Sequence, residues 1–111
     1  MERLDAESDP IGVYERIAEE LTAGGAIRGA MFGMPCLKFG RKAFAGYFHG
    51  DMVFKLRGPA HARALALPGA RLFDPSARGR PMKVWVQVPG ACSSEWLDLG
   101  RDALDTGVQD S

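Results

Sequence analysis

The chain has 111 residues, of which 46% are hydrophobic, and its formal net charge is zero. This length suits one domain, and the composition allows a sizeable core, which excludes a disordered chain. No apolar run approaches the ~18 residues of a membrane-spanning helix, and the charged residues 1–5 lack the apolar part of a secretory signal. We therefore predict one cytoplasmic domain over 1–111, with its core at about 10–106 and no membrane contact.

The neutral total hides three segments of different charge. Residues 1–25 hold seven acids and two bases (−5), residues 26–89 two acids and eleven bases (+9), and residues 90–111 five acids and one base (−4). A basic middle between acidic ends leaves an anionic partner open.

The first predicted element is a helix over 10–23. Asp9 is the expected N-cap, Pro10 suits the first helical position, and Gly24-Gly25 ends the helix. Apolar residues then recur at helical spacing, namely Val13, Tyr14, Ile17, Ala18 and Leu21.

Hairpin-linked strands follow, predicted over 28–32, 36–39 after a break at Pro35, 42–48 and 51–56. His49-Gly50 fits a two-residue turn, which pairs Phe48 with Asp51. One face of this hairpin is then apolar, with Ala43, Ala45 and Tyr47 opposite Leu56, Phe54 and Met52. The other is mixed, with Phe44, Gly46, Phe48, Asp51, Val53 and Lys55.

The remaining pattern predicts a short helix over 60–67, an extended piece at 72–73, a loop over 74–81 and a strand over 82–88. In that strand Met82, Val84, Val86 and Val88 share a face opposite to Lys83, Trp85 and Gln87. A last helix starts near Ser93 or Ser94, and we expect fraying from about Gly107. This order predicts an α+β fold, a mainly antiparallel sheet flanked by helices over 10–23 and 94–106.

Cys36 is the candidate reactive group. In a strand it shares a face with Lys38, whose ammonium would lower the thiol pKa and favour the nucleophilic thiolate. The alternative is a small residue packed in a sheet. No base is placed beside Cys36, so we predict ordinary thiol behaviour and keep a redox role as the alternative.

Other chemistry is poorly matched by the spacing. The glycines do not fit a phosphate-loop template, and Cys36, Cys92, His49 and His61 show no metal-ligand spacing. Carboxylates lie mostly on the terminal helices, where a solvated face is the usual role. We therefore predict no cofactor, no metal and no catalytic residue.

Anion binding is the best-supported binding chemistry. Arg78, Arg80 and Lys83, with Lys38, offer guanidinium and ammonium groups for phosphate or carboxylate. Trp85 and Phe44 could stack beside them. The alternatives are a solvated loop, or ion pairs with the acidic helices of the same domain.

The residues MFGMPCLKFGRKAFAGYFHGDMVFKL (31–56), GARLFDPSARGRPMKVWVQVP (69–89) and the acidic Trp-containing helix resemble, in this order, the N-terminal domain of the TfoX/Sxy family. The match covers roughly residues 10–106. The resemblance implies a YjbR/MmcQ-like antiparallel sheet with flanking helices. It also implies a link to transcription in natural competence, where full-length proteins carry a second helical domain not expected in this chain ending at Ser111. It supplies no catalytic residues.

The leading hypothesis is thus a small non-enzymatic binding or regulatory module that contacts a protein partner or, weakly, a polyanion such as nucleic acid. The alternatives are a redox or enzymatic protein using Cys36, and a structural or oligomerisation domain. A homodimer stays open.

Overall fold

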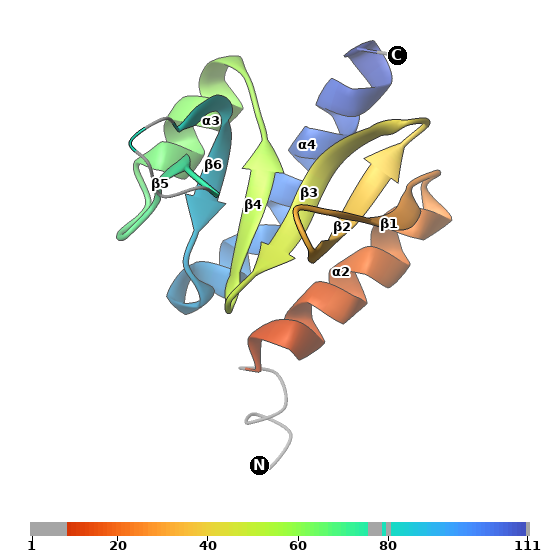
Figure 1. Cartoon of the computed structure of the whole chain (residues 1–111), viewed down its shortest axis with the longest axis horizontal. Helices are drawn as coiled ribbons and strands as arrows, with labels where there is room; N and C mark the ends of the chain where they lie inside the picture. Colours follow the sequence, from red (N-terminus) through yellow and green to blue (C-terminus); the bar gives the residue numbers. More distant parts are fainter. Residues whose placement is uncertain (1–8, 76–78, 80, 111) are drawn as a thin grey trace.

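The computed structural model describes residues 9–75, 79 and 81–110. All strands lie in one antiparallel sheet of order β1-β2-β3-β4-β6-β5 (Figure 1). The elements are α2 (Pro10–Ala23), β1 (Ile27–Met31), β2 (Met34–Phe39), β3 (Lys42–Phe48), β4 (Asp51–Lys55), α3 (Gly58–Leu65), β5 (Arg71–Phe73), β6 (Met82–Val88), the 3-10 helix η1 (Gly90–Glu95) and α4 (Trp96–Asp110). The predicted α+β fold is confirmed.

Helix α2 has the predicted bounds, and its predicted apolar residues are all buried. The expected role of Asp9 is wrong, because its side chain makes no capping hydrogen bond. The helix instead begins through the backbone, where the Val13 N–H donates to the Asp9 carbonyl at 3.0 Å. Pro10 lacks an N–H to satisfy and has a φ suited to the first turn, so the helix starts there without a side-chain cap.

The β3–β4 hairpin has the predicted register, with Phe48 opposite Asp51, and His49 and Gly50 have φ angles of 51° and 88°. The predicted break at Pro35 is wrong, because β2 runs through it. Pairing of β2 with β3 begins only at Cys36, so the missing proline N–H removes no hydrogen bond between these strands.

A bulge moves Phe44 to the other face of the sheet from the one predicted. The register of β2 against β3 shifts between Leu37, opposite Ala45, and Lys38, opposite Ala43, which leaves Phe44 without a partner in the ladder. The extra residue in a bulge interrupts the alternation of side chains between the two faces, so Phe44 points to the same side of the sheet as Ala45. Phe44 is fully buried in the helix-covered core, and Ala43 packs on the opposite face.

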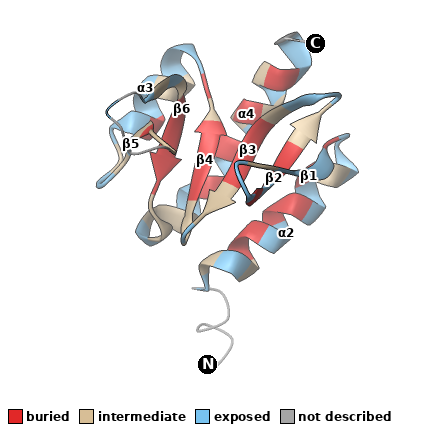
Figure 2. Ribbon diagram, viewed as in Figure 1, coloured by how far each residue is buried: buried red, intermediate tan, exposed pale blue. Residues whose placement is uncertain are grey.

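Two apolar clusters lie on the two faces of the sheet. The larger lies between the sheet and helices α2, α3 and α4, and Figure 2 shows its buried residues along the central strands and the inner sides of the helices. The smaller contains Met34, Val53, Phe73 and Trp85. The predicted mixed face is therefore a second core, although no helix of the described chain packs on it.

Curling of the sheet encloses this second core. Phe73 of β5, at one edge, contacts both Phe48 and Phe32, with ring centroids 5.1 and 6.5 Å apart. Phe32 belongs to the turn after β1, the strand at the opposite edge. The two edges of the sheet thus meet across its concave face, and we call this surface the concave face below.

The C-terminal elements follow the prediction with three differences. Only Val86 and Val88 reach the helix-covered core, because the register of β5 against β6 shifts after Leu72 and leaves Met82 and Val84 on the second cluster. The 3-10 turn η1 precedes α4, and α4 continues to Asp110 without the expected fraying. Gly107 is buried against Phe39 and Phe44, which ties the last turn to the sheet.

Candidate functional site

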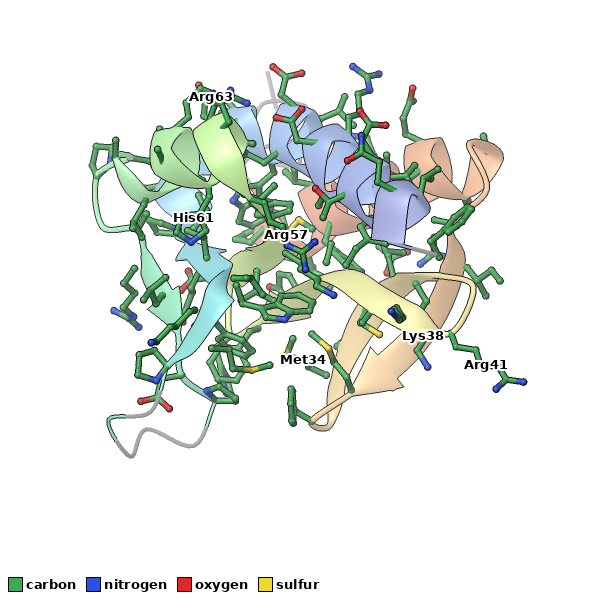
Figure 3. All side chains as sticks on the ribbon, turned by 90° about the horizontal axis from the view of Figure 1, so that it is seen from above. Met34, Lys38, Arg41, Arg57, His61 and Arg63 are labelled. Carbon is green, nitrogen blue, oxygen red and sulfur yellow. The ribbon has the colours of Figure 1, made fainter. Side chains whose placement is uncertain are left out.

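Basic side chains without an ion-pair partner among the described residues gather at one end of the sheet. Lys38 is the second-last residue of β2, Arg41 lies in the turn into β3, Lys42 is the first residue of β3, and Lys83 is the second residue of β6. The register places the end of β4 beside the start of β6, where the Leu56 N–H donates to the Val84 carbonyl at 2.9 Å. Figure 3 looks onto this end, with Lys38 and Arg41 on one side and Arg57 near the middle. We call Lys38, Arg41, Lys42 and Lys83 the basic rim.

The rim is a strip rather than a single point. Lys38 and Lys83 lie on strands separated by β3 and β4. Three strand spacings of about 4.8 Å put their backbones about 14 Å apart along the sheet. A small anion can therefore contact only part of the rim, whereas an extended polyanion can follow all of it.

Other bases of the middle segment are neutralised by the acidic helices. Arg28 pairs with Glu15 of α2 at 2.9 Å, and Arg63 of α3 pairs with Asp102 of α4. In the described part of the chain, the four rim side chains take part in no such ion pair. Acids of the helices thus neutralise Arg28 and Arg63, whereas the rim side chains remain available. The predicted alternative of ion pairs concerned Arg78 and Arg80, which lie outside the described residues.

The predicted anion site is only partly described. Arg78 and Arg80 lie outside the described residues. Lys83 is exposed, and its carbonyl accepts a hydrogen bond from His61 Nε2 at 2.9 Å, a contact that ties α3 to the start of β6. Lys38 is half-buried, and its stem lies over Gly29, where an added Cβ would stand 2.9 Å from the Lys38 Cε.

The expected stacking residues do not form a platform. Phe44 is fully buried on the helix-covered side, and Trp85 is 6% exposed within the second core. The most exposed aromatic ring of the described residues is Phe32, at 61%. The predicted strand over 28–32 is wrong at Phe32, because Phe32 and Gly33 form the two-residue turn between β1 and β2. A glycine between two strand-like stretches is a signal for such a turn. Both residues have positive φ, 51° and 75°.

Cys36 lies wholly inside the sheet, between Gly29 of β1 and Gly46 of β3. Burial raises the pKa of the Cys36 thiol, and the Lys38 ammonium opposes this only in part. Neither histidine serves as its base, because His49 packs on Phe48 with ring centroids 4.3 Å apart and His61 contacts Lys83. These surroundings favour the protonated thiol.

The concave side carries two cavities separated by Phe48. One of about 330 Å³ lies between the turns Phe32–Gly33 and His49–Gly50, and another of about 660 Å³ lies beside Arg71 and Gln87. Gln87 is the one buried polar residue among those described, and its Nε2 donates to Asp51 at 2.7 Å. Neither cavity brings a nucleophile beside a base.

Residues 9–75, 79 and 81–110 contain no group of three His, Cys, Asp or Glu side chains placed to hold a metal ion. In the same residues, every helix is too short or too polar to cross a bilayer. No protein-family model matches the chain, and comparisons with curated proteins and with solved structures also find no match.

Proposed function

We propose that this chain is a small non-enzymatic binding module that holds extended polyanions, nucleic acid first among them, along the basic rim. The observation that carries the proposal is the separation of charge. The acids of α2 and α4 neutralise Arg28 and Arg63 on the helix side, while the rim cations at the end of the sheet keep no ion-pair partner in the described residues.

The strip geometry supports a polymer over a small anion. Four cations spread over about 14 Å along the sheet can each meet a different phosphate of one strand. The rim of the described residues consists of lysine and arginine side chains, so we expect phosphate contacts to dominate and unrelated sequences to bind alike. A regulatory role near nucleic acid, as the resemblance to the TfoX/Sxy N-terminal domain implies, belongs to the same proposal.

The absence of an assembled reaction centre in the described residues supports a binding role. Cys36 is buried with a raised pKa, and no base contacts it. Catalysis by a nucleophile needs a thiolate or an adjacent base within hydrogen-bond reach.

The test is a fluorescence anisotropy titration with labelled single-stranded and duplex oligonucleotides of unrelated sequences. If four rim cations each displace one counterion, affinity for duplex should fall about hundredfold between 50 and 200 mM salt, and unrelated sequences should bind alike. The variant Arg41→Ala/Lys42→Ala should lower affinity at low salt and reduce the salt slope by about 1.8.

The matched control is Arg63→Ala/Arg101→Ala, which removes the same two charges from arginines that pair with Asp102 and Glu20. This control should bind within about threefold of the wild type, because both arginines already pair with carboxylates of the helices, unlike the rim cations. The proposal fails if the wild type does not bind at low salt, or if the two double variants lose affinity equally.

A further inference from the structure

The edge strand β1 presents a free side. In the described chain it pairs only with β2, and its first four residues are exposed. The two most exposed large hydrophobic side chains of the described residues lie at its two ends, Ile27 at 55% and Phe32 at 61%. An edge strand with apolar ends is a template for a further strand.

The opposite edge carries the features that block such pairing, and β1 lacks them. Strand β5 is only three residues long, begins with the exposed Arg71 and is followed by Asp74 and Pro75. Strand β1 has five residues with neither proline nor lysine. Its one charge, Arg28, is held by Glu15 at 2.9 Å. Short length, charge and proline are the usual protections of an edge.

The β1–β2 register shows which backbone groups face outward. The two-residue turn joins Met31 and Met34, which are opposite each other. Residues that flank such a turn form a hydrogen-bonded pair. Every second residue of β1 before Met31, namely Gly29 and Ile27, is then also hydrogen-bonded to β2. The N–H and carbonyl groups of Arg28 and Ala30 therefore point away from β2.

This arrangement is complementary to itself. A two-fold axis at Gly29 sets Arg28 opposite Ala30 of a second copy, so that all outward groups of both residues are paired. The same register sets Ile27 opposite Met31 of the second copy, next to the exposed Phe32. Arg28 of each copy then lies opposite Ala30 of the other copy and not opposite the other Arg28.

The charges of the rim also favour this orientation. Lys38 lies opposite Ile27, so the basic rim stands at the Ile27 end of β1, whereas Phe32 lies at the other end. Antiparallel pairing sets the rim of one copy beside the apolar turn of the other. A parallel arrangement would set the two rims side by side, with repulsion between like charges.

We propose that the chain forms a symmetric homodimer in which two β1 strands pair antiparallel about Gly29 and join the two sheets into one. The occupant of the free edge is thus a second copy of this chain. The proposal is independent of polyanion binding, which uses the other end of β2 and the start of β6.

The first test is sedimentation equilibrium over a range of protein concentrations. The wild type should show a monomer–dimer equilibrium. Ala30→Lys places a lysine opposite Arg28 of the second copy at both symmetric positions of the dimer. The dissociation constant of the dimer should therefore rise by about tenfold or more. Ala62→Lys, at an exposed alanine of α3, is the matched control and should dimerise as the wild type does.

The second test fixes the register. In a Cys92→Ser background, Gly29→Cys should form an intermolecular disulfide with oxidised glutathione, because opposed residues that are not hydrogen-bonded to each other have Cα atoms about 4.5 Å apart. The new Cβ meets only the far end of the Lys38 side chain, which can move. Ala30→Cys should not cross-link, because two copies of residue 30 lie beyond the ~7 Å limit for a disulfide.

Several outcomes overturn the proposal. A monomer at all concentrations, an Ala30→Lys variant that dimerises like the wild type, or cross-linking by Ala30→Cys in preference to Gly29→Cys would each exclude this dimer. Circular dichroism spectra should be unchanged in all variants, since Gly29, Ala30 and Ala62 are exposed.

Discussion

A buried phenylalanine of the second core on the concave face should contribute as much stability as one of the helix-covered core, and Phe73→Ala tests this. Phe73 is fully buried and makes edge-to-face contacts with Phe48 and Phe32. Removing the ring takes away its burial, those aromatic contacts and the join between the two edges of the sheet. A matched variant is Phe54→Ala, a fully buried phenylalanine on the helix-covered face.

Buried Phe→Ala substitutions cost about 3–5 kcal/mol, which combines lost hydrophobic transfer with a cavity. Domains of this size are stable by about 5–15 kcal/mol, so the loss is a large share of the total. At about 4 °C per kcal/mol, the melting temperature should fall by about 12–20 °C. Urea unfolding at pH 7, followed by circular dichroism, measures both variants. A loss below about 1 kcal/mol for Phe73→Ala, with the full loss for Phe54→Ala, would show that the concave face is not a core.

Burial raises the pKa of Tyr14 to about 12, so the neutral side chain stabilises the fold fully below about pH 10. This stability should be lost between about pH 10 and 12, because the tyrosine of the unfolded chain ionises first. Tyr14→Phe should reduce the slope of the unfolding free energy, measured with urea, by up to about 1.4 kcal/mol per pH unit in that range. The half-buried Cys92 should react with iodoacetamide before the buried Cys36, as read by peptide mass spectrometry, and equal rates in the folded protein would contradict the burial argument. Gly107→Ala should stabilise the protein by up to about 1 kcal/mol in thermal unfolding, because an added Cβ meets ordinary contacts of 3.5 Å or more and the helix gains propensity; a destabilised variant would contradict this packing.

Local patterns in the sequence were sufficient for most elements. The helical spacing from Val13 to Leu21 and the glycines after it determine α2, because periodicity and helix-ending residues act within one turn. The His49-Gly50 turn determines the register of β3 against β4, since a slip by one residue would reverse every side chain. The excess of bases over residues 26–89 is likewise a property of the sequence.

The tertiary structure alone decided which face each side chain occupies at the bulge and which bases stay unpaired. The alternation of residues in the sequence assigns Phe44 to the concave face, but the bulge in β3 opposite β2 places its side chain in the helix-covered core. The second core requires Phe32 and Phe73, from opposite edges of the sheet, to meet through curling of all six strands. Arg28 and Arg63 are neutralised by acids on separate helices, whereas Lys38 and Lys83 come to one end of the sheet only through strand order. Such contacts join residues distant in the chain, and no pattern within a few residues encodes them.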